Sequence, residues 1–193
     1  MSVKDNSLVE KFKTALTSTA KVISDDLQLN ENNKKKTDNS INIEIDNLTK
    51  PSDFIKLRAE TDSVALKKKF SNKDIYKNNL PTNPSSRSLY KIAEKIRYEC
   101  LGGKMLKGIE KNFNENYKEI INRTRKEKLR NKEDVAVTEA FERYMLKNFH
   151  HIELNTLTRR MLNFWEKDFE KSIEKHKKFL QDNLDNQQQY SSR

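Results

Sequence analysis

Three ionisable residues, Glu94, Arg97 and Glu99, lie close together in the sequence at helical spacing. Two neighbouring carboxyl groups can act as a general acid and a general base when a desolvated cleft holds them. Here both carboxylates have basic neighbours, and the surrounding pattern is that of an amphipathic helix. We therefore expect these charges to lie on the outer, solvated faces of a helix, and we assign no catalytic residue.

A second possible chemistry is phosphate binding by the sequence Gly102-Gly103-Lys104. A phosphate-binding loop needs an earlier glycine, where this chain has Tyr98, and a serine or threonine after the lysine, where it has Met105. The match fails because both required residue types are missing. The sequence therefore indicates no nucleotide bound by this chain.

The histidines do not have the spacing of a metal site. His150 and His151 are adjacent and would diverge on a helix, while His176 is distant in the sequence. We interpret the adjacent pair as helix-terminating or surface residues. The single cysteine, Cys100, lies on an apolar stripe, which favours a buried thiol over a nucleophile. The sequence thus predicts neither a metal nor a cofactor bound by the chain.

The elements that carry these residues are helical. Apolar residues over 89–100 recur at helical spacing and form one stripe. The apolar residues over 105–113 would point to roughly the opposite side if the same helix continued. We therefore expect the helix to break or bend at Gly102 and Gly103, where glycine supplies the backbone freedom that a corner needs.

Further elements follow from the same patterns. Amphipathic helices are predicted over residues 8–23, 50–70, 134–149 and 156–184. Alternating isoleucines at 41–45 predict a half-buried strand, which pairs with residues 27–29 as a short hairpin. The predicted fold class is mainly α, a helical bundle with a small β-hairpin insertion near residues 27–46.

The composition sets limits on organisation and partners. We divide the 193 residues into a flexible N-terminus at 1–7, a helical domain at 8–184 and a polar tail or start of a linker at 185–193. A net charge of +10 suits nucleic acid, an anionic membrane or an acidic partner, and does not choose among them. Without a bilayer-length apolar run or a signal-peptide core, the chain is expected to be cytoplasmic, with no membrane partner.

Several blocks occur in an order and spacing typical of one protein family. These blocks are a first helix with Phe12, Ala15 and Leu16; a helix with Arg58, Asp62, Ala65 and Leu66; a central block with Glu94, Arg97, Glu99, Leu101, Gly102, Met105, Gly108, Ile109 and Asn112; and a late Trp165 followed by Glu166. In these residues the chain resembles the N-terminal region of the T subunit of the aerobic, ATP-dependent cobaltochelatase, the CobT family.

The resemblance implies a complex of three subunits. A large CobN-like subunit binds hydrogenobyrinic acid a,c-diamide and inserts cobalt, a CobS-like AAA+ subunit uses ATP and magnesium, and the T subunit couples the two. This chain would then be a non-catalytic coupling or scaffold subunit of a metal–nitrogen bond-forming ligase in cobalamin biosynthesis, docking to the AAA+ ATPase. The family continues into an acidic linker and a von Willebrand factor A domain that this sequence lacks, so we expect a fragment, a truncated product or one part of a longer protein.

The resemblance also implies roles for the shared residues. Arg58 with Asp62, and Arg97 with Glu94, are either internal ion pairs that fix helix packing or partner contacts, and we favour the internal interpretation. The candidate structural or partner-binding residues are Arg58, Asp62, Glu94, Arg97, Glu99, Gly102, Met105, Gly108, Asn112 and Trp165.

Two alternatives stay open. One is a basic helical protein that binds nucleic acid, whose affinity would fall steeply with salt. The sequence disfavours it because the aromatic residues lie in apolar stripes and are not interleaved with arginines, as a single-strand binding surface requires. The other is a truncated paralogue that regulates another AAA+ ATPase.

Overall fold

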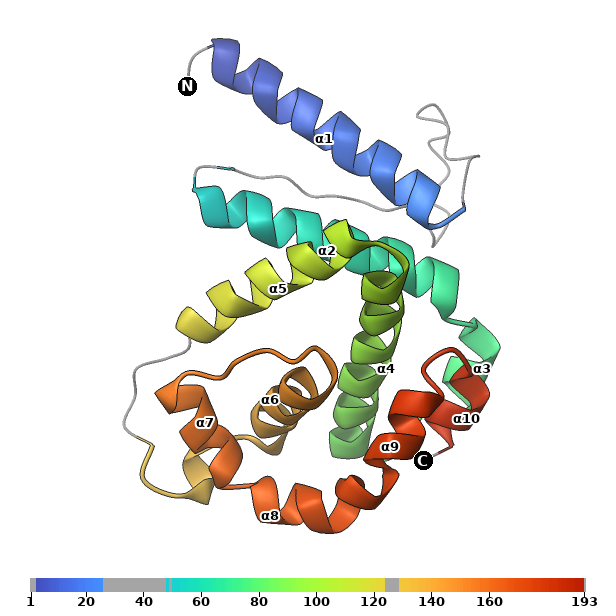
Figure 1. Ribbon diagram of the computed structural model, residues 1–193, viewed down its shortest axis with the longest axis vertical. Helices are drawn as coiled ribbons and strands as arrows, with labels where there is room; N and C mark the ends of the chain where they lie inside the picture. Colours follow the sequence, from blue (N-terminus) through green and yellow to red (C-terminus); the bar gives the residue numbers. More distant parts are fainter. Residues whose placement is uncertain (1–2, 26–47, 49, 124–128, 193) are drawn as a thin grey trace.

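The computed structural model describes residues 3–25, 48, 50–123 and 129–192, and every regular element in this part of the chain is helical (Figure 1). The elements are α1 (Val3–Ile23), α2 (Pro51–Phe70), α3 (Lys73–Asn78), α4 (Pro84–Met105), α5 (Lys107–Asn122), η1 (Lys132–Asp134), α6 (Val137–Phe149), α7 (Thr156–Asn163), α8 (Glu166–Phe169), η2 (Glu170–Glu174), α9 (Lys175–Asp182) and α10 (Gln187–Ser191). The prediction of a mainly α fold is confirmed. The predicted hairpin near residues 27–46 lies outside the described residues.

Helix α4 is the central element of the fold. It packs against α2, α5 and α6, and in Figure 1 it stands across the directions of α2 and α5. Its start follows from local chemistry, because Pro84 occupies the first turn and the Asn83 side chain accepts hydrogen bonds from the amides of Ser85 and Ser86 (2.9 and 3.2 Å). A helix in this position presents side chains to neighbours on several sides.

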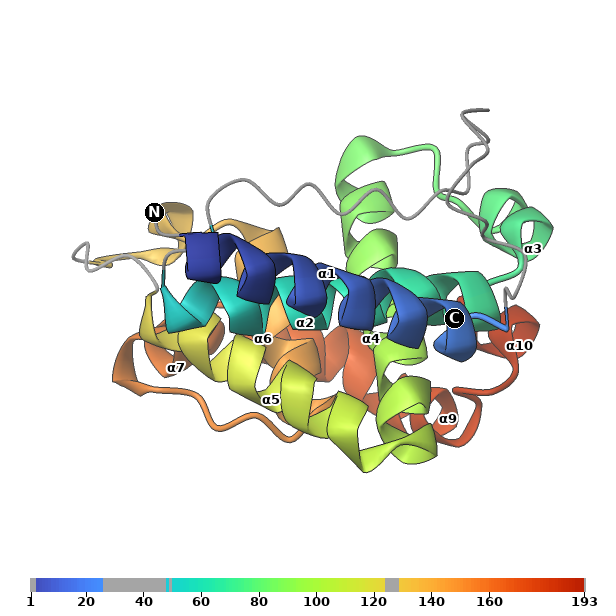
Figure 2. The ribbon, with the colours of Figure 1, turned by 90° about the horizontal axis from the view of Figure 1, so that it is seen from above.

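Helix α2 forms a layer between α1 and the α4–α5 pair (Figures 1 and 2). It begins at Pro51, and the Asp53 carboxylate accepts a hydrogen bond from the Lys50 amide (2.8 Å). α1 lies along its outer side, where Phe12 meets Phe54 edge-on at 5.1 Å between ring centroids. The predicted helices at 8–23 and 50–70 are therefore confirmed.

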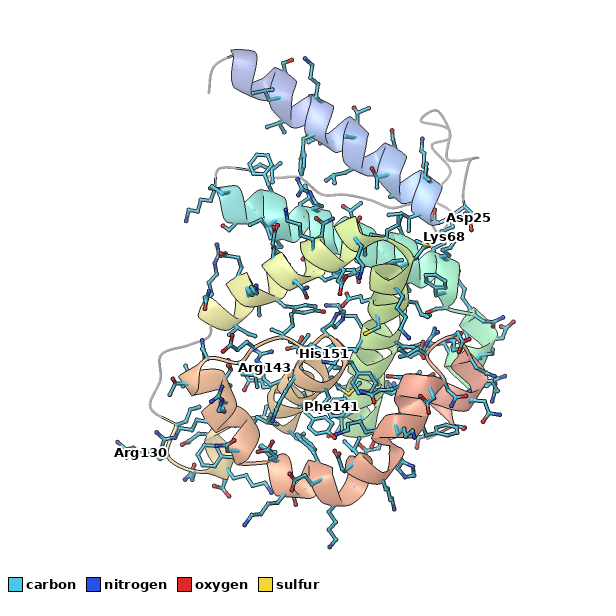
Figure 3. The ribbon with its side chains drawn as sticks, viewed as in Figure 1. Asp25, Lys68, Arg130, Phe141, Arg143 and His151 are labelled. Atoms are coloured by element: carbon cyan, nitrogen blue, oxygen red, sulfur yellow. The ribbon has the colours of Figure 1, made fainter. Side chains whose placement is uncertain are left out.

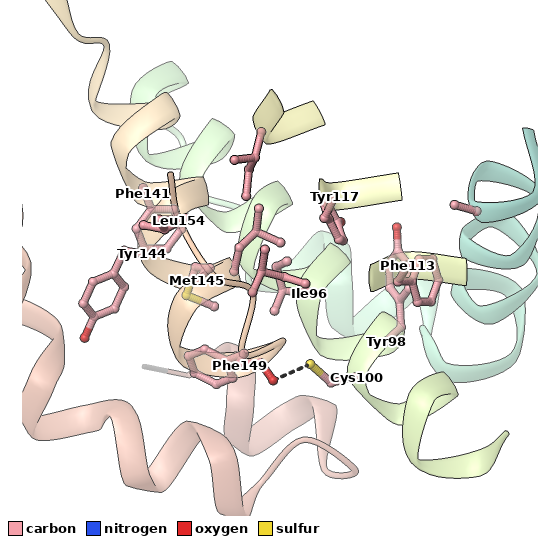
Figure 4. Close-up of a cluster of buried hydrophobic side chains, with 14 of the residues drawn as sticks. Ile96, Tyr98, Cys100, Phe113, Tyr117, Phe141, Tyr144, Met145, Phe149 and Leu154 are labelled. Atoms are coloured by element: carbon pink, nitrogen blue, oxygen red, sulfur yellow. Dashed lines mark hydrogen bonds between the residues drawn. The ribbon is translucent and has the colours of Figure 1, made fainter. Parts of the chain in front are cut away.

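The hydrophobic core lies where α4, α5 and α6 meet (Figure 4). Ile96 of α4, Phe113 and Tyr117 of α5, and Met145 of α6 are almost completely buried. Cys100 is buried beside them, and its thiol donates to the Phe149 carbonyl oxygen (3.6 Å between Sγ and O). The expected buried thiol is confirmed.

The corner between α4 and α5 is not where the sequence placed it. α4 continues through Gly102 and Gly103, neither of which has a positive φ, and the chain turns at Leu106, which is extended (φ −140°, ψ 120°). Gly102 is needed for packing, since a Cβ there would lie 2.3 Å from the Leu66 Cδ1 atom of α2. The glycine prediction was wrong because close helix contact, and not a bend, explains this residue.

The predicted single helix over 156–184 was also wrong. α7 ends at Asn163 and residues 164–165 form a turn; α8, the π-helical turn η2 and α9 then follow one another without a gap and curve around α6 (Figure 1). At the turn after α7, the Trp165 indole donates to the Val135 carbonyl oxygen (3.0 Å) and its ring stacks on Phe169 at 6.4 Å. A single straight helix could not follow this curved path. The turn after α7 and the π-helical turn η2 interrupt the regular α-helical hydrogen bonds where the chain bends around α6.

The chain ends are more regular than the sequence indicated. α1 begins at Val3, within the segment 1–7 that was expected to be flexible. Residues 187–191, expected to belong to a polar tail, form α10, in which Gln187 and Tyr190 are buried. α10 is the last element of the chain, and it packs against α3 (Figure 1). Despite its polar composition, this segment makes hydrogen bonds to residues that are distant in the sequence.

Candidate functional site

The three charged residues of α4 are buried. Glu94, Arg97 and Glu99 are only 2%, 1% and 1% exposed. The expectation that they lie on solvated outer faces was therefore wrong. Their helix is covered on several sides by elements distant in sequence, and helical periodicity alone does not show how many sides a helix buries. Ions removed from water need partners, and each of these three has a defined set.

Arg97 is the centre of the first set. Its Nε donates to Glu94 Oε1 (2.9 Å), its Nη1 to the Leu184 carbonyl oxygen (3.0 Å) and its Nη2 to the Phe70 carbonyl oxygen (2.7 Å). The carbonyl partners lie at the end of α2 and just after α9. One guanidinium therefore holds together three separate parts of the chain, and the predicted internal pairing of Glu94 with Arg97 is confirmed.

Glu94 uses its remaining capacity to hold α10. Its carboxylate accepts hydrogen bonds from Gln187 Nε2 (3.0 Å) and Ser191 Oγ (3.3 Å). The Gln187 side-chain oxygen in turn accepts from the Asn72 amide (2.7 Å), and the Tyr190 hydroxyl donates to the Ala93 carbonyl oxygen (3.0 Å). These contacts explain why a segment with so few apolar residues is ordered against the body.

Glu99 is the centre of the second set. Its carboxylate accepts from Ser63 Oγ of α2 (2.7 Å) and from the Tyr117 hydroxyl of α5 (2.5 Å). Burial raises the pKa of Glu99, but the interactions with His150, Lys95 and Tyr117 outweigh it and hold the pKa below its usual value. Burial, reinforced by the negative charge of Glu99, raises the pKa of Tyr117 well above its usual value. Glu99 is thus a carboxylate at neutral pH.

His150 follows the end of α6 and lies beside Glu99. Its side chain is 7% exposed, and Nε2 is 3.5 Å from Glu99 Oε2, which is too long for a strong hydrogen bond. Burial lowers the pKa of His150, but its interactions with Cys100 and Glu99 raise the pKa to about 9, so the imidazole is charged at neutral pH. Its helix-terminating position is as expected, while the interpretation as a surface residue was wrong. His151 is exposed, with φ 55° (Figure 3).

A pocket of about 230 Å³ opens beside this second set. It lies between the α4–α5 corner and the end of α6, and Glu99, His150, Lys104 and Lys107 are among the residues that line it. Glu110, also in the lining, forms an ion pair with Lys107 (2.9 Å). The site therefore combines a buried ion pair with lysines at its rim.

Nearly the whole chain matches a known family. A family model described as cobalamin biosynthesis protein CobT matches residues 6–193. The chain belongs to the CobT family. It is accordingly a cobaltochelatase subunit of cobalamin biosynthesis, and the resemblance found in the sequence is confirmed. Searches of curated proteins and of solved structures gave no match.

The second charged pair that the resemblance implied, Arg58 with Asp62, has a different arrangement from the one expected. Asp62 of α2 is buried and accepts a hydrogen bond from Asn112 Nδ2 of α5 (2.6 Å). Burial raises the pKa of Asp62, and the Asn112 hydrogen bond and the charge of Arg58 only partly offset it. Arg58 itself lies over the Phe12 ring (5.9 Å from Cζ to the centroid). Asp62 thus joins α2 to α5, and Arg58 faces α1.

The remaining candidate residues from the sequence analysis fall into two groups. Gly102 and Trp165 make internal contacts, with Leu66 and with the Val135 carbonyl oxygen as described above. In addition, Lys132 Nζ lies 4.1 Å from the Trp165 ring centroid. Met105 is 39% exposed, and a Cβ at Gly108 would have no atom within 4 Å. These last two residues therefore face solvent at the α4–α5 corner.

Sequence reasoning did not identify several residues of the site. Ser63, Tyr117 and His150 surround Glu99, and Gln187 binds Glu94. Tyr117 continues the i, i+4 stripe of α5, which predicts burial but not a carboxylate partner. Gln187 lies in a polar run with no periodic signal. No local pattern could have paired these residues, because their partners are far away in sequence.

The described residues contain neither a metal-binding cluster nor a helix suited to crossing a membrane. No group of three or more histidine, cysteine, aspartate or glutamate side chains there has an arrangement able to hold a metal ion. None of the described helices has the length and apolar character needed to cross a membrane.

Proposed function

We propose that this chain is the coupling subunit of an ATP-dependent cobaltochelatase and that it docks to the AAA+ ATPase subunit of the complex. In this proposal the ATPase uses ATP and magnesium, and the large subunit inserts cobalt into hydrogenobyrinic acid a,c-diamide. Cobalt is the substrate of the complex, and the chain itself is a rigid connector that binds no cofactor. Membership of the CobT family supports this assignment.

The observation that carries the proposal is the internal use of three buried charges, Glu94, Arg97 and Glu99. Arg97 and Glu94 join α2, α4 and α10, while Glu99 joins α2, α4 and α5. Breaking such buried pairs destabilises a protein strongly, so their combined effect is to fix the relative positions of the helices. A body with fixed geometry is what a subunit needs in order to transmit a conformational change from one partner to another.

Association with the ATPase tests this proposal. The full chain and the AAA+ subunit from the same organism are co-purified with ATP, with ADP and without nucleotide. We expect the chain to be retained with ATP, and we expect cobalt insertion by the three-subunit mixture to require it. As a control, an unrelated basic helical protein should not be retained. Failure of the folded chain to associate in all three nucleotide conditions would refute a coupling role.

A further inference from the structure

The α4–α5 corner carries exposed apolar residues and an exposed glycine. Met105 and Leu106 are 39% and 49% exposed, and Gly108 has open space where a side chain would be. Figure 2 shows this corner at the edge of the molecule, where α4 meets the start of α5. An exposed apolar pair next to an open glycine provides a surface to which another backbone can come close.

The pocket beside this corner is suited to a carboxylate. α5 begins here, and its N-cap, Leu106, offers no side-chain acceptor. The amides of Ile109 and Glu110 donate to the Leu106 carbonyl oxygen (3.0 and 3.3 Å), which leaves the amides of Lys107 and Gly108 at the start of this 16-residue helix for an anion. His150 also lines the pocket and its side chain is more than nine-tenths buried, but its Nε2 faces Glu99 at 3.5 Å and is not counted among the groups left for an anion. Lys104 has no carboxylate partner among the described residues, so its charge is available at the rim.

The two acidic residues of the lining do not cancel this positive character. Glu99 is held by Ser63 and Tyr117 and faces His150, so its charge is already balanced. Glu110 is paired with Lys107 at 2.9 Å. The groups left to attract an anion are therefore Lys104 and the amides of Lys107 and Gly108 at the start of α5.

We propose that the α4–α5 corner and its pocket bind an acidic segment of the AAA+ ATPase subunit. One carboxylate of the segment enters the pocket near Lys104 and the first turn of α5, and a neighbouring apolar side chain packs against Met105 and Leu106. Charge complementarity selects an acidic occupant, and the open Gly108 lets the backbone of the segment come close. This inference rests on the proposed function and specifies where the partner docks.

Charge reversal at the corner tests the inference. The double variant Lys104→Glu/Lys107→Glu of the full chain is compared with Lys171→Glu/Lys175→Glu, which makes the same charge change at exposed positions of η2 and α9. Binding to the ATPase subunit is measured with ATP at several salt concentrations. We expect the corner variant to bind at least about tenfold more weakly and with a shallower salt dependence, and the control to change less than about twofold. Circular dichroism and thermal unfolding establish that both variants are folded.

A third variant, Met105→Asp, tests the apolar part of the surface separately. It should weaken binding without removing a positive charge. Equal binding by wild type and all three variants would overturn the docking surface while leaving the coupling role intact. Loss of binding to the large subunit alone would also overturn it, because the occupant would then be another protein. If wild type fails to bind the ATPase, the proposed function itself is refuted.

Discussion

Replacing Gly102 with alanine tests how closely α4 and α2 pack. An added Cβ would lie 2.3, 2.6 and 3.0 Å from the Cδ1, Cδ2 and Cγ atoms of Leu66. Leu66 is completely buried. Either the leucine leaves its rotamer or the two helices move apart, and both responses disturb the neighbouring contact of Glu99 with Ser63.

The magnitude follows from two opposing terms. Overpacking a close-packed core costs about 1–3 kcal/mol. Alanine in place of glycine in a helix interior contributes about 1 kcal/mol of stability. Since the clash involves a branched, fully buried side chain, we place the packing cost at the upper end and expect Gly102→Ala to lower the free energy of unfolding by about 2 kcal/mol. The same change at Gly108 meets no atom within 4 Å and should be neutral or stabilising.

Urea unfolding followed by circular dichroism and by the fluorescence of Trp165 measures both variants. The two substitutions are chemically identical, so their difference isolates the contact with Leu66. In a Leu66→Ala background the added methyl fills vacated space, and Gly102→Ala should then be neutral or stabilising. The reasoning is refuted if Gly102→Ala is as stable as Gly108→Ala, or if the Leu66→Ala background does not relieve its cost.

Three further predictions concern the buried charges. Arg97→Leu leaves Glu94 buried without its cation and should lower the free energy of unfolding by about 3–5 kcal/mol, measured by urea unfolding; a loss below 1 kcal/mol would contradict the network. The pKa of His150 rises from 6.5 to about 9 on folding, so its contribution of up to about 3 kcal/mol is complete below pH 6.5 and is lost as the pH rises through 9. Unfolding measured from pH 6 to pH 10 should show this decline in wild type and not in His150→Gln. Gln187→Ala should increase hydrogen exchange and proteolysis in α10 while α5 stays protected, and uniform protection would argue against its anchoring role.

Sequence patterns predicted the elements that depend on local chemistry. Pro51 marks the start of α2, and apolar periodicity identified α1 and α6. The same patterns failed where a distant residue decides the outcome. Gly102 was taken for a bend because Leu66 could not be placed opposite it. One helix was predicted over 156–184 because the contacts of Trp165 that accompany the break after α7 are tertiary.

For the candidate site, the sequence identified important residues but did not predict their burial. The family resemblance identified Glu94, Arg97 and Glu99 as important, but their polar character predicted exposure and the structure buries them. Burial of a charge depends on partners such as Ser63 and Gln187, which come from other helices. Pairing information of this kind is absent from a single sequence, whereas residue type and spacing are fully present in it.

The connection between α4 and α5 is a single extended residue, Leu106. Because the link is so short, a displacement of the start of α5 would be transmitted to α4 and would not be absorbed by a flexible loop. From α4 the displacement would reach the end of α2 and the segment after α9 through the hydrogen bonds that the Arg97 guanidinium donates to their carbonyl oxygens. The corner is therefore coupled through α4 to the end of α2 and to the segment after α9.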